Sequence, residues 1–179
     1  TLATSSAASD VYKRQLEGGD CFWLNSSTLA VGRGFRSNEN GIHQMRDILS
    51  DLDINVVQFD LPPQDDPDAC LHLMSVVSPL DHDLALIYEP LMPNNLQGVL
   101  KDFGYDLLSA PVNEFELSYG LSLNVLAVSE RNVIAIEGFD ETRALMENAG
   151  CVVSTFSGDE LCIPCEGGPT CLTRPVLRK

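Results

Sequence analysis

One pattern of strands and helices recurs three times along the sequence, and this internal repeat constrains the fold more than any other feature. In each copy, two apolar stretches suited to strands flank a short turn, and an amphipathic helix and a third apolar strand follow. The predicted order is strand, strand, helix, strand, written ββαβ. Modules of this kind cannot bury their apolar faces alone, so they must stack on one another or close into a ring. We predict an α/β fold that forms part of such a ring.

The first copy shows the pattern that the other two repeat. Its hairpin consists of "CFWLN" and "TLAVGRG", its helix is "NENGIHQMRDILSDL", and its last strand is "INVVQFDL". The corresponding stretches are "LHLMSVVSPL", "LALIYEP", "NNLQGVLKDFG" and "DLLSAPV" in the second copy, and "LSLNVLAVSE", "NVIAIEG", "DETRALMENAG" and "VVSTFSG" in the third. We expect the hairpin turn of the second copy at residues 81–83.

The ends and faces of the helices support this register. Gly104 and Gly150 follow the last turns of two helices, where a left-handed residue is favoured, and Asp53 takes that place in the first copy. Apolar residues at helical spacing predict a buried stripe on two of the helices. The stripes consist of Ile42, Met45, Ile48, Leu49 and Leu52 on one helix and of Leu96, Val99, Leu100 and Phe103 on the other.

The composition is that of a globular protein with an acidic surface. Of the 179 residues, 44% are hydrophobic and 21% are charged, and the formal net charge is -15 at pH 7. This balance argues against nucleic acid or an acidic membrane as a partner, because both require basic patches. No stretch approaches the roughly 18 apolar residues of a membrane span. Six cysteines in a chain of this length fit a reducing compartment, so we expect a cytoplasmic location.

The first 15 residues, "TLATSSAASDVYKRQ", differ in character from the rest of the chain. They have low apolar content and no clear period, and "SSAASDVYKRQ" is similar to a translated adapter. We therefore expect residues 1–15 to be a non-native leader and exclude them from the fold. Residues 16–179 are then expected to form one domain that lacks its N-terminal part.

Four polar residues stand at corresponding positions, each near the start of a module's first strand. They are Glu17 in "LEGGD", His72 in "LHLMS", Asn124 in "LSLNVL" and Cys171 in "GGPTC", where a fourth strand would begin; their separations are 55, 52 and 47 residues. Taken singly, they fit an exposed carboxylate, a core histidine, a turn asparagine and a buried thiol. Modules repeated around a pseudo-axis would instead bring all four to one place, and the shared period favours a single active centre.

The motifs that carry these residues, together with "GRGFRSNENG", resemble the guanidine-modifying (pentein) superfamily. Its members include arginine deiminases, amidinotransferases and dimethylarginine dimethylaminohydrolases. The resemblance covers residues 16–179 and implies a propeller of five ββαβ modules, of which this chain would supply about three and the closing strand. It implies an enzyme without a cofactor or metal ion that binds a small guanidino substrate. The module edges left exposed by the missing part would favour a homodimer.

The resemblance also assigns roles to the catalytic residues. Cys171 would attack the guanidinium carbon and form an S-amidino intermediate. His72 would protonate the leaving amine and then activate water, and Glu17 would orient His72.

Three further residues are expected at the substrate. Arg36 in "GRGFRSN" would bind the substrate's α-carboxylate, with Arg33 as the substitute if the register is shifted, and a plain surface arginine as the alternative. Asn124 and Asp20 complete the set. For Asn124 a structural role is the alternative, and Asp20 would otherwise fix the turn after Glu17.

One departure from the family pattern bears on the substrate. Deiminases and amidinotransferases carry His-x-Asp, whereas the third residue here is Met74. This favours a dimethylargininase-like hydrolase of C–N bonds in linear amidines, acting on methylated arginine or arginine. An arginine deiminase or dihydrolase and an amidinotransferase remain alternatives. Because the family's other guanidinium-binding acids precede "EGGD", we also expect that the chain as it stands could lack activity.

A second motif supports an alternative of another class. Cys162 and Cys165 in "CIPC" have the spacing of half a zinc site or of a redox pair, so a non-catalytic metal or redox module is the second alternative. A second paired motif is absent, and further ligands would have to come from Cys171, His72 or Cys151. "DHD" at residues 81–83 is similar to a metal-binding triplet, but we interpret it as the hairpin turn.

Overall fold

The chain divides into two compact units, and its computed structural model describes residues 14–63 and 71–173. The first unit comprises Thr1–Met74 and Pro93–Leu96, and the second comprises Ser75–Met92 and Gln97–Lys179. Residues 1–13 of the expected leader lie outside the described residues. Within the described part, Gln15 is hydrogen-bonded to the first module, since its carbonyl oxygen accepts from the backbone N–H of Asn38 at 2.9 Å.

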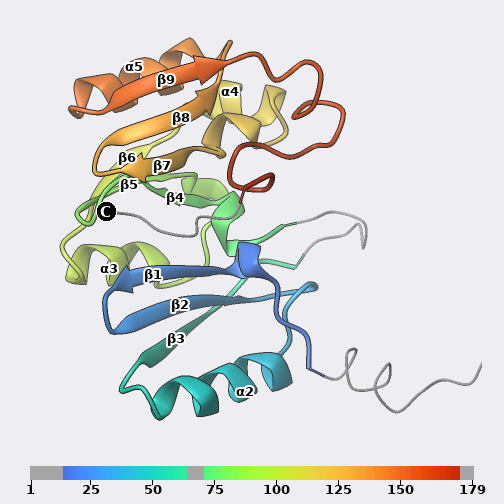
Figure 1. Cartoon of the computed structure of the whole chain (residues 1–179), viewed down its shortest axis with the longest axis vertical. Coiled ribbons are helices and arrows are strands. Elements are labelled where there is room, and N and C mark those ends of the chain that lie inside the picture. Colours follow the sequence, from blue (N-terminus) through green and yellow to red (C-terminus); the bar gives the residue numbers. More distant parts are fainter. Residues whose placement is uncertain (1–13, 64–70, 174–179) are drawn as a thin grey trace, which may run out of the picture. The chain divides into compact units, whose positions relative to one another are not determined.

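The first unit contains one ββαβ module, as the sequence predicted (Figure 1). Its strands form a three-stranded sheet in the order β1-β2-β3, with the first pair antiparallel and the second pair parallel. The helix α2 packs on this sheet around a small apolar core. The elements are β1 (Cys21–Asn25), β2 (Thr28–Arg33), α2 (Glu39–Ser50) and β3 (Asn55–Asp60), and the core residues are Leu29, Val31, Ile42 and Val56.

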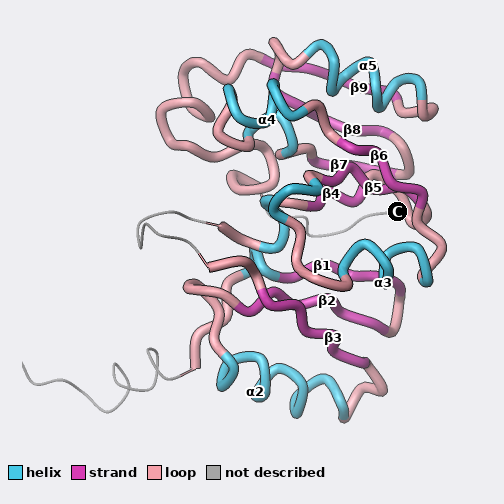
Figure 2. The backbone as a smooth tube through the Cα atoms, turned by 180° about the vertical axis from the view of Figure 1, so that it is seen from behind, coloured by secondary structure: helices cyan, strands magenta, loops and turns pink. Residues whose placement is uncertain are grey.

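Two further modules with the same strand pairing follow, and Figure 2 shows the repeated order along the backbone. Each has an antiparallel hairpin whose second strand pairs in parallel with the strand after the helix. A short helix, α4 (Val112–Leu117), connects the two modules. Their elements are β4 (Val77–Pro79), β5 (Leu84–Ile87), α3 (Leu96–Asp102) and β6 (Asp106–Ser109), then β7 (Leu126–Ser129), β8 (Asn132–Ile136), α5 (Asp140–Asn148) and β9 (Val152–Phe156).

The first strands of the second and third modules are shorter than predicted, because a 3₁₀ turn replaces the start of each. Residues 71–75 contain the turn η2 (Leu73–Ser75), and residues 121–125 contain η4 (Leu121–Leu123). In "LHLMSVV", Leu73, Val76 and Val77 are completely buried. This spacing suits a helical turn and not the alternation of a strand. The polar residues assigned to these strands therefore stand beside turns that precede the sheet.

The helix ends are confirmed, and the apolar stripe of α2 is confirmed in part. The predicted left-handed residues have positive φ angles of 56° at Asp53, 87° at Gly104 and 88° at Gly150. In α2, Ile42 is buried, but Ile48 and Leu52 are 56% and 65% exposed. The sheet has only three strands, so it covers the part of the stripe nearest to it and leaves the remainder in solvent. Among the described residues, no helix has the length and apolar character needed to cross a membrane.

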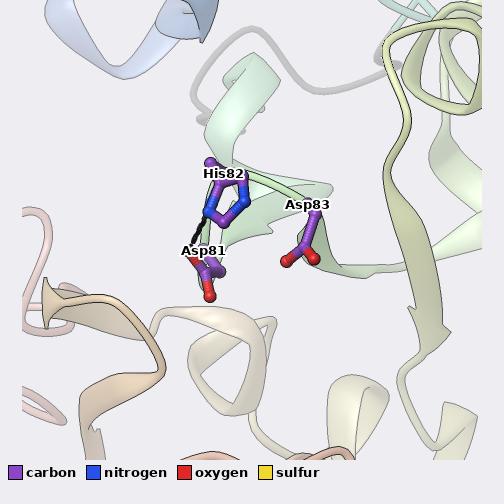
Figure 3. Close-up of side chains that lie close together, drawn as sticks. All are labelled: Asp81, His82 and Asp83. Atoms are coloured by element: carbon purple, nitrogen blue, oxygen red, sulfur yellow. Dashed lines mark hydrogen bonds and ion pairs between the residues drawn. The ribbon is translucent and has the colours of Figure 1, made fainter.

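The "DHD" triplet forms the predicted turn between β4 and β5, and its carboxylates bind an arginine. Arg131 pairs through Nε with Asp81 at 3.0 Å and through Nη2 with Asp83 at 2.9 Å. The Nδ1 atom of His82 lies 2.7 Å from the other oxygen of Asp81 (Figure 3). The guanidinium also donates to the carbonyl of Ala149 at 2.7 Å. The triplet is therefore an ion-pair cluster that joins the second and third modules.

The start of α5 is capped by a side chain from outside the helix. The residue before the helix, Phe139, offers no side-chain acceptor. Instead, the Glu114 carboxylate of α4 accepts hydrogen bonds from the backbone N–H groups of Glu141 and Thr142 at 2.9 and 2.8 Å, and from the Thr142 hydroxyl at 2.6 Å. A carboxylate at a helix N-terminus satisfies unpaired N–H groups and interacts favourably with the helix dipole. Glu114 thereby joins α4 to α5.

Replacing Glu114 by alanine is expected to lower the free energy of unfolding by about 1–2 kcal/mol, because three donors at the start of α5 lose their acceptor. Urea denaturation followed by circular dichroism measures this change. Glu116→Ala is the matched control, since Glu116 lies in the same helix and its carboxylate accepts only a long hydrogen bond, at 3.5 Å, from the Tyr88 hydroxyl. Equal effects of the two substitutions would contradict the capping role.

Candidate active site

Glu17 and His72, which lie 55 residues apart in the sequence, form a hydrogen bond in the first unit. Glu17 precedes the 3₁₀ turn η1 (Gly18–Asp20), and His72 precedes η2. The distance from His72 Nε2 to Glu17 Oε2 is 2.9 Å, and the two side chains are 20% and 30% exposed. An ionised carboxylate can only accept, so Nε2 carries the proton in this pair. The structure thus brings together two of the three residues expected to carry the chemistry.

The glycines of "EGGD" allow the backbone to approach the imidazole ring closely. A Cβ atom on Gly19 would lie 2.8 Å from Cγ and 3.0 Å from Cδ2 of His72. These separations are shorter than carbon atoms tolerate, so a side chain at position 19 would displace the ring. The need for glycine here comes from a contact 53 residues away in the sequence and not from the local backbone.

Arg36 is the arginine beside this pair, and its neighbour Arg33 is engaged elsewhere. The Nε atom of Arg36 donates to Glu17 Oε1 at 3.0 Å. Arg33 instead binds both oxygens of Asp60 at 2.7 and 2.8 Å and Glu39 at 2.9 Å. Arg36 is therefore better placed than Arg33 for the role predicted at the substrate, although its contact with Glu17 was not anticipated.

Glu17 has a lowered pKa. Desolvation of its partly buried carboxyl raises the pKa, but the hydrogen bonds and charges of His72 and Arg36 outweigh this, so the pKa lies below its ordinary value of 4.5. Glu17 is consequently ionised at neutral pH. An ionised carboxylate on Nε2 is the form that fixes the tautomer and orientation of an imidazole.

Asp20 lies completely buried behind this pair. Its Oδ1 accepts from the backbone N–H of Leu73 at 2.9 Å, and its Oδ2 accepts from the Ser37 hydroxyl at 2.6 Å. Burial raises the pKa of this carboxyl, and the two hydrogen bonds oppose the shift. Of the two roles expected for Asp20, these contacts favour the one that fixes backbone near Glu17.

Asn124 and Cys171, both in the second unit, form the other part of the predicted site. The Asn124 Nδ2 group donates to Cys171 Sγ at 3.0 Å. Its Oδ1 accepts from the backbone N–H and the hydroxyl of Thr170 at 2.9 and 2.5 Å. Asn124 therefore holds the segment that carries Cys171 and also directs an amide proton at the thiol sulfur.

Cys171 lies in a turn and not at the start of a strand. Its backbone N–H donates to the Gly168 carbonyl at 3.0 Å, and no strand is formed between Cys171 and Thr173, where the described residues end. The preceding glycines permit close packing here too. A Cβ atom on Gly168 would overlap the Asn124 side chain, and one on Gly167 would lie 3.2 Å from Cys171 Cβ. Two consecutive glycines have no side chains to pack in a sheet, so they favour this turn over a strand.

The environment of Cys171 distinguishes it from the other described cysteines. Burial raises the pKa of the Cys21 thiol to about 11 and also raises the pKa of Cys151 and Cys162. Cys165 and Cys171 are exposed. Only the thiolate form of cysteine is nucleophilic, so the buried thiols are expected to be inert. Of the two thiols exposed in the described part of the chain, Cys171 is the one that accepts a hydrogen bond from the Asn124 amide.

The "CIPC" motif does not gather a third ligand in the described part of the chain. There, the only group of three potential metal ligands whose donor atoms lie within 4.8 Å of one another is Asp81, His82 and Asp83. Arg131 and His82 already occupy those carboxylates. Neither motif offers an assembled metal site of the tetrahedral kind that zinc prefers.

Sequence reasoning missed Ser37 and Thr170, which contact the predicted residues. Both are small hydroxyl residues next to a predicted one, Ser37 after Arg36 and Thr170 before Cys171. A hydroxyl carries no charge and follows no period, so position beside a motif residue was the only signal available.

The sequence and the fold are both similar to those of known proteins. The family model described as Arginine deiminase matches residues 3–113, which is more than half of the chain. The arginine deiminase of Rhodococcus opacus is 27% identical over 195 residues, covering 91% of this chain and 46% of the relative. The chain spans about half the length of the curated relatives it matches.

Solved structures show the same fold. SxtG, an amidinotransferase from the saxitoxin biosynthetic pathway of Microseira wollei, matches with a TM-score of 0.75 and 21% identity, over 90% of this chain and 47% of that one. DDAH from Pseudomonas aeruginosa, complexed with citrulline, matches with a TM-score of 0.62 and 21% identity, over 82% and 50%. The chain is thus a member of the guanidine-modifying (pentein) superfamily, as its motifs predicted. Within that superfamily, it belongs to the arginine deiminase family.

Replacing Gly19 by alanine is expected to displace the His72 ring and to lower the free energy of unfolding by about 1–3 kcal/mol, the usual cost of an added methyl group in a packed site. Nuclear magnetic resonance of the histidine ring reports the displacement. Gly98→Ala is the control, because a Cβ atom at Gly98 in α3 meets no atom within 4 Å. Because alanine is favoured over glycine inside a helix, Gly98→Ala is expected to raise the free energy of unfolding by about 0.5–1 kcal/mol. Unchanged His72 signals in Gly19→Ala would refute the contact.

Proposed function

We propose that this protein is a cysteine-dependent hydrolase that cleaves a C–N bond of a guanidino compound. The observation that carries the proposal is the hydrogen bond from Asn124 to the exposed sulfur of Cys171. The amide N–H orients this exposed sulfur, which is the nucleophile of the proposed reaction. Besides a nucleophile, the reaction needs an oriented acid and base, and the hydrogen-bonded pair of Glu17 and His72 supplies it.

The chemistry explains why these residue types are needed. A guanidinium is a poor electrophile, since its positive charge is delocalised, and its amine leaves only when protonated. In the proposed first step, Cys171 Sγ forms a bond to the guanidinium carbon, the C–N bond breaks, and His72 gives a proton to the departing amine. In the second step, His72 takes a proton from water, the hydroxide attacks the S-amidino carbon, and the C–S bond breaks. The products are an amine, a urea derivative and the regenerated thiolate.

Electrostatics supports a cationic substrate. The chain has a net charge of -15, and Glu17 is ionised at neutral pH. A negative field raises the local concentration of a guanidinium ion. We propose that Arg36, whose guanidinium stands beside Glu17, also binds the carboxylate of an amino-acid substrate. These features suit arginine or a methylated arginine.

The residue two positions after His72 bears on the choice between those substrates. Met74 has an apolar side chain and supplies no carboxylate to bind an unsubstituted guanidinium. We therefore propose methylated arginine as the preferred substrate, with the five-module α/β propeller of the superfamily as the fold of the whole enzyme. Deimination of arginine is the alternative, because the chain is similar to arginine deiminases.

Treatment with 2-chloroacetamidine, a cationic alkylating agent that resembles a guanidinium, tests this proposal. We expect selective modification of Cys171, measured by peptide mass spectrometry, and slower modification in the presence of methylated arginine. Cys165 is an internal control, since it is also exposed but lacks the Asn124 contact. Neutral iodoacetamide should modify both thiols. Equal modification of Cys165 and Cys171 by the amidine, or modification confined to Cys162 and Cys165, would overturn the assignment.

A further inference from the structure

A buried acid and a buried serine connect the backbone segments that carry the proposed acid–base pair. Asp20 is the last residue of η1, three residues after Glu17, and its side chain has no solvent exposure. Through Oδ1 it accepts from the backbone N–H of Leu73, the residue after His72, at 2.9 Å. One carboxylate therefore links the segment of Glu17 directly to the segment of His72.

Ser37 adds the third segment to this link. Its hydroxyl donates to Asp20 Oδ2 at 2.6 Å and accepts from the backbone N–H of Glu17 at 2.9 Å. A serine hydroxyl has one proton and two lone pairs, so both directions are satisfied at once. Ser37 is also completely buried and directly follows Arg36, which contacts Glu17.

The carboxylate is not needed to form the turn in which it lies. The turn after Glu17 is already closed by a backbone hydrogen bond, from the N–H of Asp20 to the Glu17 carbonyl at 3.0 Å. Burying a carboxyl group is costly unless hydrogen bonds compensate it. Space for it is left by Gly32 of β2, where a Cβ atom would lie 3.1 Å from Asp20 Oδ1. What the side chain adds is its contact with Leu73 and Ser37.

We propose that Asp20 and Ser37 are positioning residues that hold the Glu17 carboxylate and the His72 imidazole at hydrogen-bonding distance. Neither touches the substrate; both act through the backbone on either side of the pair. The geometric part stands independently, whereas its consequence for catalysis rests on the function proposed above. Displacement of a catalytic group by about 1 Å can reduce the rate by roughly 10²-fold, so loss of this link is expected to reduce turnover on that order.

The test is Ser37→Ala, compared with Ser78→Ala as the matched control. Ser78 is another buried serine, in the second unit, whose hydroxyl donates to the Leu123 carbonyl at 2.6 Å. Both substitutions remove one buried hydroxyl and the 2.6 Å hydrogen bond that it donates, and Ser37→Ala also removes the bond that the hydroxyl accepts from Glu17. We expect Ser37→Ala to abolish or shift the Nε2–H signal of His72 in the magnetic resonance spectrum of histidine-labelled protein. Ser78→Ala should leave that signal in place, and Ser37→Thr, which keeps the hydroxyl, should restore it.

A second pair of variants keeps the proposal testable if Ser37→Ala fails to fold. Asp20→Asn preserves the size of the side chain but has one acceptor oxygen in place of two, so a smaller loss of the His72 signal is expected. Asp60→Asn removes the same charge from an exposed position, where Asp60 pairs with Arg33. It should leave the signal unchanged. A His72 signal that is identical in wild type and Asp20→Asn would overturn the positioning role.

Turnover of methylated arginine separates this inference from the proposed function. An active wild type with about 10²-fold lower turnover in Ser37→Ala supports both. A shifted His72 signal in a protein that turns over no guanidino compound supports the positioning role and refutes the function. An active wild type whose turnover and His72 signal both survive Ser37→Ala supports the function and refutes the positioning role.

Discussion

The contact between the Gly19 backbone and the His72 ring is the constraint on which the candidate site depends. The imidazole can reach the Glu17 carboxylate only because no Cβ atom stands between the turn and the ring. The second unit uses the same device, since the absence of a side chain at Gly168 leaves room for Asn124 beside the turn that presents Cys171. In each of the chain's two "EGG" motifs, a glycine thus leaves room for a side chain that is distant in the sequence.

The modules supply the scaffold, and the entry turns supply the chemistry. In each described module the helix carries none of the predicted catalytic residues, whereas Glu17, His72 and Asn124 lie beside the 3₁₀ turn that precedes the first strand. The first strands are short, with five, three and four residues in the three modules. The sheet fixes the backbone of a residue that lies just before such a strand, but the side chain of that residue is not buried in the core. This explains how one module design can present a carboxylate, an imidazole and an amide at equivalent positions.

Local patterns predicted much of this structure, and long-range contacts account for the remainder. The three ββαβ modules and the left-handed residue Asp53 followed from hydrophobic periodicity and helix-end chemistry, which are properties of adjacent residues. The pairing of Glu17 with His72 was accessible because the repeat placed both at one module position. The sequence did not predict three contacts: the partner of Arg36, the link through Ser37 and the cap that Glu114 provides for α5. Each depends on distances across 17 to 28 residues that no local pattern encodes.

The central claim is that Cys171 attacks a guanidinium carbon, and the most direct measurement is the mass of the intermediate. Protein mixed with methylated arginine, quenched with acid within a turnover and digested, should yield the Cys171 peptide heavier by the mass of the substrate less its departing amine. Cys171→Ser should yield no such peptide. If product accumulates while the Cys171 peptide keeps its original mass at every quench time, or if the adduct lies on another cysteine, the account of this site is wrong.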